Sequence, residues 1–180
     1  SLANFYIRQN KTEKGIEEYN VSLQKDPNAI FALMGLGMIY DIQKKYDKAK
    51  EYYQKILKIN PKFPPAANNL AYLYAERGEN IDEALNLAQS AKELVPDDPH
   101  ISDTLGWIYY KKNVFSRSIV YLKEAKEKMP NNAAINYHLG MAYYKNGENE
   151  LAKNELKKAL ELDPKFPGAE EAKSTLTKIK

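Results

Sequence analysis

The sequence predicts an all-α fold, a right-handed α-solenoid of antiparallel helix pairs, and three observations support this prediction. Prolines that follow long helix-forming runs recur at spacings of 34, 35, 34 and 34 residues. Apolar residues between them lie three and four positions apart, which is the period of an amphipathic helix. Several of the 14 tyrosines fall into register when the prolines are aligned. A constant period of this length indicates stacked structural repeats.

Each period is predicted to form two helices joined by a turn. The first helix carries a leucine, a small residue and a tyrosine on one stripe, as at Leu36, Gly37 and Tyr40. The second helix carries small residues such as Ala49, and short side chains let the two helices of a pair cross closely. The aligned prolines are Pro27, Pro61, Pro96, Pro130 and Pro164, and the registered tyrosines are Tyr6, Tyr40, Tyr74, Tyr109 and Tyr143.

These columns divide the chain into six segments. The chain begins inside a first helix, so we expect a fragment of a longer repeat protein that starts with a partial unit. One extra residue near Glu79-Asn80-Ile81 predicts a longer turn between the two helices of one unit. After the last proline, apolar residues from Ala169 to Ile179 form one stripe beside charged residues such as Lys180, which predicts a capping helix. The segments are a partial unit at 1–29, complete units at 30–63, 64–98, 99–132 and 133–166, and the capping helix at 167–180.

Polar residues precede three of the predicted first helices, at Asn28, Asp98 and Asn132. Their side chains can accept hydrogen bonds from the free N–H groups at a helix start. We therefore expect these residues to act as helix N-caps rather than as ligands.

The complete pattern resembles the tetratricopeptide repeat family, and the resemblance covers nearly the whole chain. The residues that carry it in one unit are Leu139, Gly140, Tyr143, Ala152, Ala159 and Pro164. Membership implies a scaffold that binds other proteins. Residues 69–72 and 103–110 also look like bacterial repeat proteins of envelope assembly, polysaccharide export and pilus biogenesis. That looser resemblance implies a bacterial source, and it leaves the compartment open between the cytoplasm and the periplasm or envelope.

The inner, concave wall of such a solenoid is predicted from the first helices. One residue past the core stripe is rotated by ~100° toward this wall. Aromatic, methionine and charged residues there suit a groove for a peptide or a partner helix. We expect these side chains to be exposed, with wedging between neighbouring first helices as the alternative for Tyr72 and Trp107. The predicted partner-binding residues are Met34, Met38, Asp41, Asn68, Tyr72, Glu76, Asp103, Trp107, Tyr110, Lys111, Tyr137, Met141, Tyr144 and Lys145.

Two functions fit these features, and both predict no catalysis. The first is a protein-interaction scaffold that holds a partner peptide or helix in the concave groove. The second is a structural spacer, or a self-association element acting through an exposed repeat end, in a bacterial envelope, secretion or polysaccharide-export machine. Some family members bind acidic chaperone tails through a basic clamp. That clamp is not expected here, because its columns hold Met34, Met38, Asn69, His100 and Thr104.

Composition and spacing argue against other classes. The chain has no cysteine, and His100 and His138 lie in different units without the spacing of a metal site. A net charge of +3, spread evenly, does not favour a nucleic-acid partner. No charge-free stretch reaches the roughly 20 residues that a membrane-spanning helix needs. We therefore expect no enzyme activity, cofactor, metal or nucleic-acid partner, and no membrane insertion.

Overall fold

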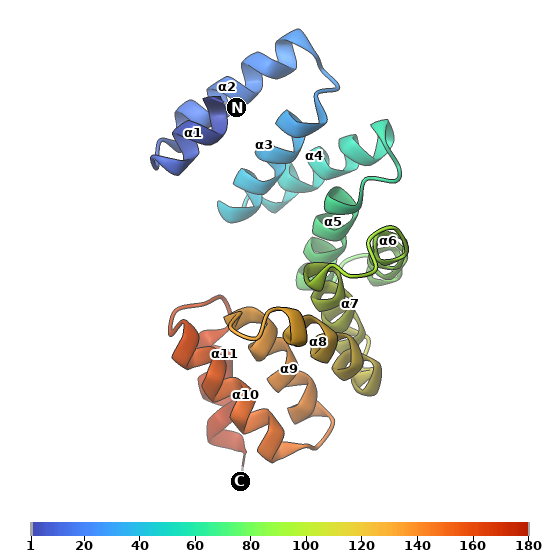
Figure 1. The fold of residues 1–180 in the computed structure, drawn as a ribbon, viewed down its shortest axis with the longest axis vertical. Coiled ribbons are helices and arrows are strands. Elements are labelled where there is room, and N and C mark those ends of the chain that lie inside the picture. Colours follow the sequence, from blue (N-terminus) through green and yellow to red (C-terminus); the bar gives the residue numbers. More distant parts are fainter. Residues whose placement is uncertain (1, 180) are drawn as a thin grey trace.

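The structure is a computed structural model that describes residues 2–179, and this part of the chain forms eleven α-helices joined by short connections (Figure 1). Ser1 and Lys180, at the ends of the first and last predicted segments, lie outside the described residues. The helices are α1 (Leu2–Arg8), α2 (Thr12–Lys25), α3 (Ile30–Ile42), α4 (Tyr46–Ile59), α5 (Pro64–Arg77), α6 (Ile81–Leu94), α7 (Pro99–Lys111), α8 (Phe115–Lys128), α9 (Ala133–Lys145), α10 (Asn149–Leu162) and α11 (Ala169–Lys178).

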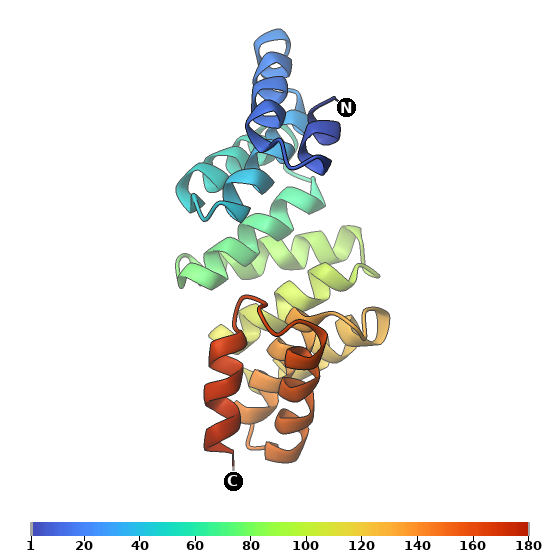
Figure 2. The same ribbon diagram turned by 90° about the vertical axis from the view of Figure 1, so that its left-hand side faces the viewer.

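Consecutive helices pair antiparallel, from α1 with α2 to α9 with α10, and the pairs stack into a right-handed superhelix. Figures 1 and 2 show this stack from two directions, with α11 lying beside the last pair. The predicted all-α solenoid is therefore confirmed. Neighbouring first helices, such as α5, α7 and α9, pack on one another along the stack.

Small residues set the distance between the two helices of a pair. A Cβ atom added at Gly106 would lie 2.4 Å from Cγ of Leu122, and one added at Gly140 would lie 2.8 Å from Cγ of Leu156. The predicted close crossing is confirmed at these positions. The two facing positions are complementary in size, because a glycine on the first helix packs against a large side chain on the second.

The pair α5–α6 solves the same packing problem differently. The columns that hold Gly106 and Leu122 in α7–α8 hold Ala71 and Ala88 here. Both alanines are fully buried. The methyl group of Ala71 fits in α5 because the facing position in α6 holds the small residue Ala88.

The connection inside each pair is closed by a repeated backbone hydrogen bond. The carbonyl of each registered tyrosine accepts from the amide five residues later, as from Lys45 to Tyr40 and from Glu79 to Tyr74. The extra residue of the α5–α6 unit is Asn80. After this hydrogen bond α4 begins with the next residue, Tyr46, whereas α6 begins two residues after Glu79, and Asn80 between them has a left-handed backbone with φ +44°. The extra residue thus lies in the segment Glu79-Asn80-Ile81, as predicted.

Helix starts are stabilised in two alternative ways. Asp98 accepts a hydrogen bond from the His100 amide, and Asn132 accepts one from the Ile135 amide, so both predicted N-caps are confirmed. Asn28 is not a cap, and α3 starts without a side-chain cap.

The register explains this difference, because the N-cap lies two residues after the proline, where α3 has Ala29 and α7 and α9 have Asp98 and Asn132. Asp26 precedes Pro27, and its carboxylate accepts from the Asn28 amide at 2.9 Å, which forms an Asx turn. Asp163 makes the same turn before Pro164. In the units that begin with α7 and α9 the residue before the proline is apolar.

The C-terminal helix α11 covers the last pair. Ala169, Ala172 and Thr175 of α11 are buried, whereas its charged residues face solvent. The Thr175 hydroxyl lies 3.6 Å from the sulfur of Met141 on α9. This helix therefore covers apolar surface that the last repeat would otherwise expose.

Candidate partner-binding groove

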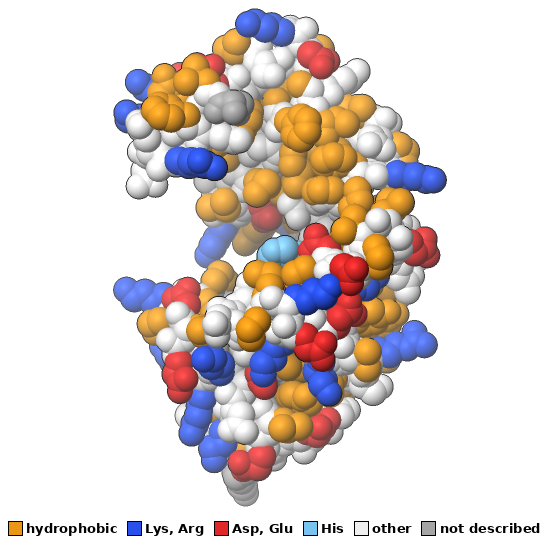
Figure 3. All heavy atoms as spheres, viewed as in Figure 1, with side chains coloured by type: hydrophobic (Ala, Val, Ile, Leu, Met, Phe, Trp, Pro, Cys, Tyr) orange, Lys and Arg blue, Asp and Glu red, His pale blue; other side chains and the backbone are white. Residues whose placement is uncertain are grey.

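The concave side of the superhelix contains two adjoining hollows. Figure 3 shows a recess in the molecular surface between α1–α4 in the upper part and α9–α11 in the lower part. The smaller hollow has a volume of about 230 Å³ and is lined by residues of α3 to α5 and of α7. The larger hollow, of about 490 Å³, lies between α3–α5 and the connection before α11. Asp41, Ile42 and Tyr72 line both, so the hollows form one groove.

The smaller hollow combines amide, carboxylate, aromatic and apolar groups. Asn68 Oδ1 is buried there without a hydrogen-bond partner in the described part of the chain. Next to it, the Asn69 amide donates a long hydrogen bond of 3.4 Å to the Tyr53 hydroxyl. The complete lining is Met38, Asp41, Ile42, Tyr53, Asn68, Asn69, Tyr72, His100, Asp103 and Thr104.

The larger hollow is bounded by residues that lie far apart in the chain. Pro167, in the connection between α10 and α11, faces residues of α3–α5 across it. Figure 2 shows this connection extending from α11 toward the middle of the molecule. The complete lining is Asp41, Ile42, Lys44, Tyr46, Tyr72, Leu73, Glu76, Arg77 and Pro167.

The predicted wall residues of α3 and α5 lie in or beside this groove. Met38 is 47% exposed, and Asp41, Asn68 and Tyr72 are half-buried at its surface. Met34 is half-buried and packs against the core.

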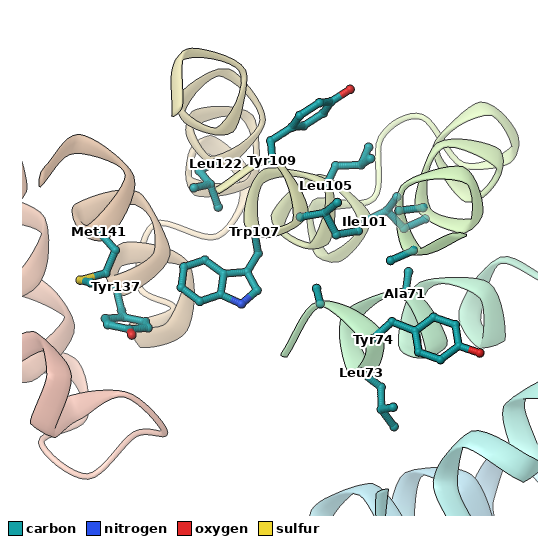
Figure 4. Packing of buried hydrophobic residues seen from close by; sticks show 14 of the residues in the cluster. Ala71, Leu73, Tyr74, Ile101, Leu105, Trp107, Tyr109, Leu122, Tyr137 and Met141 are labelled. Carbon is teal, nitrogen blue, oxygen red and sulfur yellow. The ribbon is translucent and has the colours of Figure 1, made fainter. Parts of the chain in front are cut away.

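The predicted wall residues of α7 and α9 are different, because three of them are buried. Trp107, Tyr137 and Met141 are only 4%, 4% and 3% exposed, so the expectation of exposed side chains is wrong for them. Figure 4 shows the Trp107 ring extending from α7 toward Tyr137 and Met141 on α9. The alternative of wedging between first helices holds for Trp107.

Stacked rings and the C-terminal segment account for this burial. The Trp107 ring stacks on His138 with centroids 4.1 Å apart and on Tyr110 at 4.5 Å. Tyr137 packs against Phe166 at 5.2 Å. Its hydroxyl donates to the Glu171 carboxylate on α11 at 2.7 Å. Only Tyr110 lies on the same helix as its neighbour Trp107. His138 comes from the next first helix, Phe166 from the connection after α10 and Glu171 from α11, so the pattern of one helix does not predict these contacts.

Polar wall residues connect successive first helices. The Trp107 indole N–H donates to the Glu76 carboxylate, which also lies 3.9 Å from the Lys111 ammonium. Asp103 Oδ1 lies 2.8 Å from the ring nitrogen Nδ1 of the buried His138. These contacts link α5 to α7 and α7 to α9, so they fix the geometry of the wall.

The remaining predicted residues lie at the lower part of the wall. Tyr110 and Tyr144 are half-buried, whereas Lys111 and Lys145 are exposed. Burial, together with the nearby Glu171 carboxylate, raises the pKa of Tyr110 to about 12.

Burial also changes the ionisation of the groove. It raises the pKa of the Asp41 carboxyl above its ordinary value. Burial, and then the carboxylates of Glu76, Asp103 and Asp41, raise the pKa of Tyr72. The Tyr72 hydroxyl therefore stays protonated and lies in a field of negative charge.

Several groove residues were not among the predicted set, namely Ile42, Tyr53, Asn69, His100 and Thr104. Ile42 is 81% exposed and occupies the column that holds Glu76, Lys111 and Lys145 in later units. The repeat alignment could have identified Ile42, because Glu76, Lys111 and Lys145 at the same repeat position were all among the predicted wall residues. Asn69, His100 and Thr104 stand in the columns of the basic clamp. Whether residues of these columns line the hollow depends on the rotation between successive first helices, which the sequence pattern does not give.

Two further features of the described residues bear on function. Within residues 2–179, no three histidine, aspartate or glutamate side chains are grouped so that they could hold a metal ion. None of the helices in this range has the length and apolar character needed to cross a bilayer.

An α-solenoid of helix pairs with a concave groove defines a repeat scaffold. The tetratricopeptide repeat family models match residues 30–63, 52–86 and 133–166. The chain belongs to the tetratricopeptide repeat family. The family and the fold are in general those of non-enzymatic, protein-interaction scaffolds.

The curated relatives match this chain over only part of their length. The anaphase-promoting complex subunit CDC16 of Saccharomyces cerevisiae is 27% identical over 128 residues, which cover 69% of this chain and 15% of the relative. The photosystem I assembly protein Ycf3 of Rippkaea orientalis is 36% identical over 64 residues, 35% of this chain and 37% of the relative. The matched parts are thus well under half the length of these relatives.

Solved structures share the fold. The type IV pilus biogenesis factor PilW has a TM-score of 0.78 at 19% identity, with 99% of this chain and 87% of that chain covered. MamA from Desulfovibrio magneticus has a TM-score of 0.73 at 18% identity, with 91% and 92% covered. At these identities the likeness shows the fold alone.

Proposed function

We propose that this chain binds an extended segment of a partner protein in the groove formed by α3, α5 and α7, as one part of a larger protein or assembly. The observation that carries the proposal is the continuity of the two hollows through Asp41, Ile42 and Tyr72. A continuous groove with apolar, aromatic and amide groups can contact both the side chains and the backbone of a peptide.

The composition of the groove supports a peptide rather than a small molecule. Met38 and Ile42 are 47% and 81% exposed, so an apolar side chain can cover them. Asn68 and Asn69 bring side-chain amides to the lining of the smaller hollow, and such groups can hydrogen-bond the backbone of a peptide. The most aromatic part of the wall, around Trp107, is excluded from this site because it is already buried.

The test starts from selected peptides. Random dodecapeptides displayed on phage are selected on the purified chain, and hydrogen exchange then locates each selected peptide. We expect protection in α3, α5 and α7, and we expect Tyr72→Ala to raise the dissociation constant by roughly 30-fold, as for a hot-spot aromatic. Lys145→Ala, an exposed wall substitution beyond the hollows, is the matched control and should change affinity less than twofold.

The second candidate function is self-association as a structural element of a bacterial envelope, secretion or export machine. Leu2 and Phe5 on α1, the first described helix, favour it, because they are 52% and 54% exposed. Sedimentation equilibrium at micromolar concentration measures it. Dimers that are lost in Phe5→Ser, together with selected peptides that leave the groove unprotected, would establish this function in place of peptide binding.

A further inference from the structure

The smaller hollow carries negative charge without a matching cation. Asp41 from α3 and Asp103 from α7 both line it, while no lysine or arginine does. His100 is the single basic side chain of its lining. A third carboxylate, Glu76, acts on Tyr72 at the boundary between the two hollows.

Asp41 is the group that most needs a partner. Its carboxylate is half-buried, and within the described residues it makes no hydrogen bond or ion pair. Burial without a partner disfavours the charged form, which is why the pKa of this carboxyl is raised. A cation at hydrogen-bond distance reverses this effect.

Asp103 is only partly satisfied. Its Oδ1 atom contacts His138, whose ring stacks on Trp107. Its second oxygen has no hydrogen bond in the described part of the chain. The His138 contact also fixes the position of the carboxylate, so the oxygen that remains is preorganised.

The nearby cations of the chain lie outside the smaller hollow. Lys44 lines the larger hollow with Asp41 but makes no ion pair with it within the described residues. Arg77 contacts Glu79 at 2.7 Å and Asp47 at 3.5 Å, on the side of the larger hollow. Lys111 lies 3.9 Å from Glu76. None of these side chains lines the smaller hollow, so its charge is available to a ligand.

Resting on the groove function proposed above, we propose that the partner segment carries a lysine or arginine whose cationic group binds between Asp41 and Asp103. Its aliphatic stem lies along Met38 and the Tyr72 ring, where an aromatic face and a methionine favour a cationic side chain. An apolar residue next to it in the partner covers Ile42 at the entrance of the larger hollow. Charge complementarity selects this occupant, since an acidic segment would place like charges beside an unpaired carboxylate.

The experiment uses the full chain and the peptides selected on it. We expect lysine or arginine next to an apolar residue to be enriched among the selected peptides that protect α3, α5 and α7. For one such peptide, Asp41→Asn should raise the dissociation constant by roughly tenfold or more, as should replacement of the peptide's basic residue with norleucine. The two changes combined should cost little more than either alone, because both remove the same interaction.

Matched variants separate charge from folding. Asp41→Asn removes charge from a half-buried carboxylate that has no hydrogen-bond or ion-pair partner within the described residues, so it should not lower the melting temperature and should raise it slightly. Asp103→Asn keeps an oxygen that can accept from His138 and should weaken the same peptide. Glu161→Gln removes one negative charge from exposed surface of α10 and should leave affinity within twofold.

The outcomes distinguish the two proposals. Peptides that protect the groove but show no basic enrichment, or an affinity unaffected by Asp41→Asn, overturn the basic-residue inference and leave groove binding intact. If no peptide is selected, or if the selected peptides leave α3, α5 and α7 unprotected, groove binding fails and the inference fails with it.

Discussion

One column of the wall changes character along the stack. Met38 in α3 and Trp107 in α7 occupy equivalent positions, yet Met38 is 47% exposed and Trp107 only 4%. Tyr72 between them is half-buried, and Met141 in the last unit is 3% exposed. The repeat places all four side chains on the same wall. Their neighbours in the next unit decide whether each is a contact surface or part of the core.

The upper part of the wall, α3 and α5, is open because its neighbours are small or polar. The lower part, α7 to α11, is filled by rings that stack on one another and by the capping helix. A residue that suits a binding groove by its chemical type can therefore serve stability instead. The division also leaves the proposed partner site on α3, α5 and the first turns of α7.

The largest expected effect is a difference in stability between substitutions of Trp107 and of Met38. Trp107→Ala should destabilise the protein by about 3–5 kcal/mol, because it removes a large buried ring between two units. Met38→Ala should change stability by less than about 0.5 kcal/mol, because the side chain is largely exposed. Urea denaturation followed by circular dichroism measures both. Similar losses for the two variants would contradict the distinction between an open and a filled wall.

A smaller effect is expected at the crossing of α7 and α8. Gly106→Ala should cost about 1–3 kcal/mol, since the added Cβ would lie 2.4 Å from Leu122 Cγ. In the upper part, the same column holds Ala71 opposite the column of Ala88. Thermal melting of Gly106→Ala measures the effect. An unchanged melting temperature would show that the pair α7–α8 has as much room as α5–α6.

The smallest effect is expected at the helix starts. Asn132→Ala should cost about 1 kcal/mol by removing the cap of α9, whereas Asn28→Ala should be nearly neutral because Asn28 caps nothing. Asp26→Ala should be more costly than Asn28→Ala, since it removes the Asx turn. Thermal melting of the three variants ranks them, and the reverse order for Asn28 and Asn132 would refute the assignment of these caps.

Residue columns predict the helix pairs because each depends on contacts within one unit. Gly37 and Tyr40 contact tyrosines of their own second helix, and the same close crossing recurs at Gly106 and Gly140. The close crossings and the caps at Asp98 and Asn132 are likewise local, and they too could be predicted.

The candidate site is less predictable because it depends on contacts between units. The burial of Trp107 requires His138 from the next first helix, and that of Tyr137 requires Phe166 and Glu171 from the C-terminal segment. Asn28 fails as a cap for a simpler reason, because it lies one residue before the N-cap position of α3, which Ala29 occupies. Counting two residues from each proline identifies Asp98 and Asn132 as caps and excludes Asn28.

The position of Pro167 gives the larger hollow a mechanical property. Pro167 lies 90 residues beyond Arg77, and the two face each other across the hollow only because α6 to α10 carry the chain around the superhelix. The width of this opening is therefore the sum of small rotations between successive units. A slight change of curvature, spread over several interfaces, would therefore widen or narrow the opening without breaking any single contact, and would change the size of segment that the proposed groove accommodates.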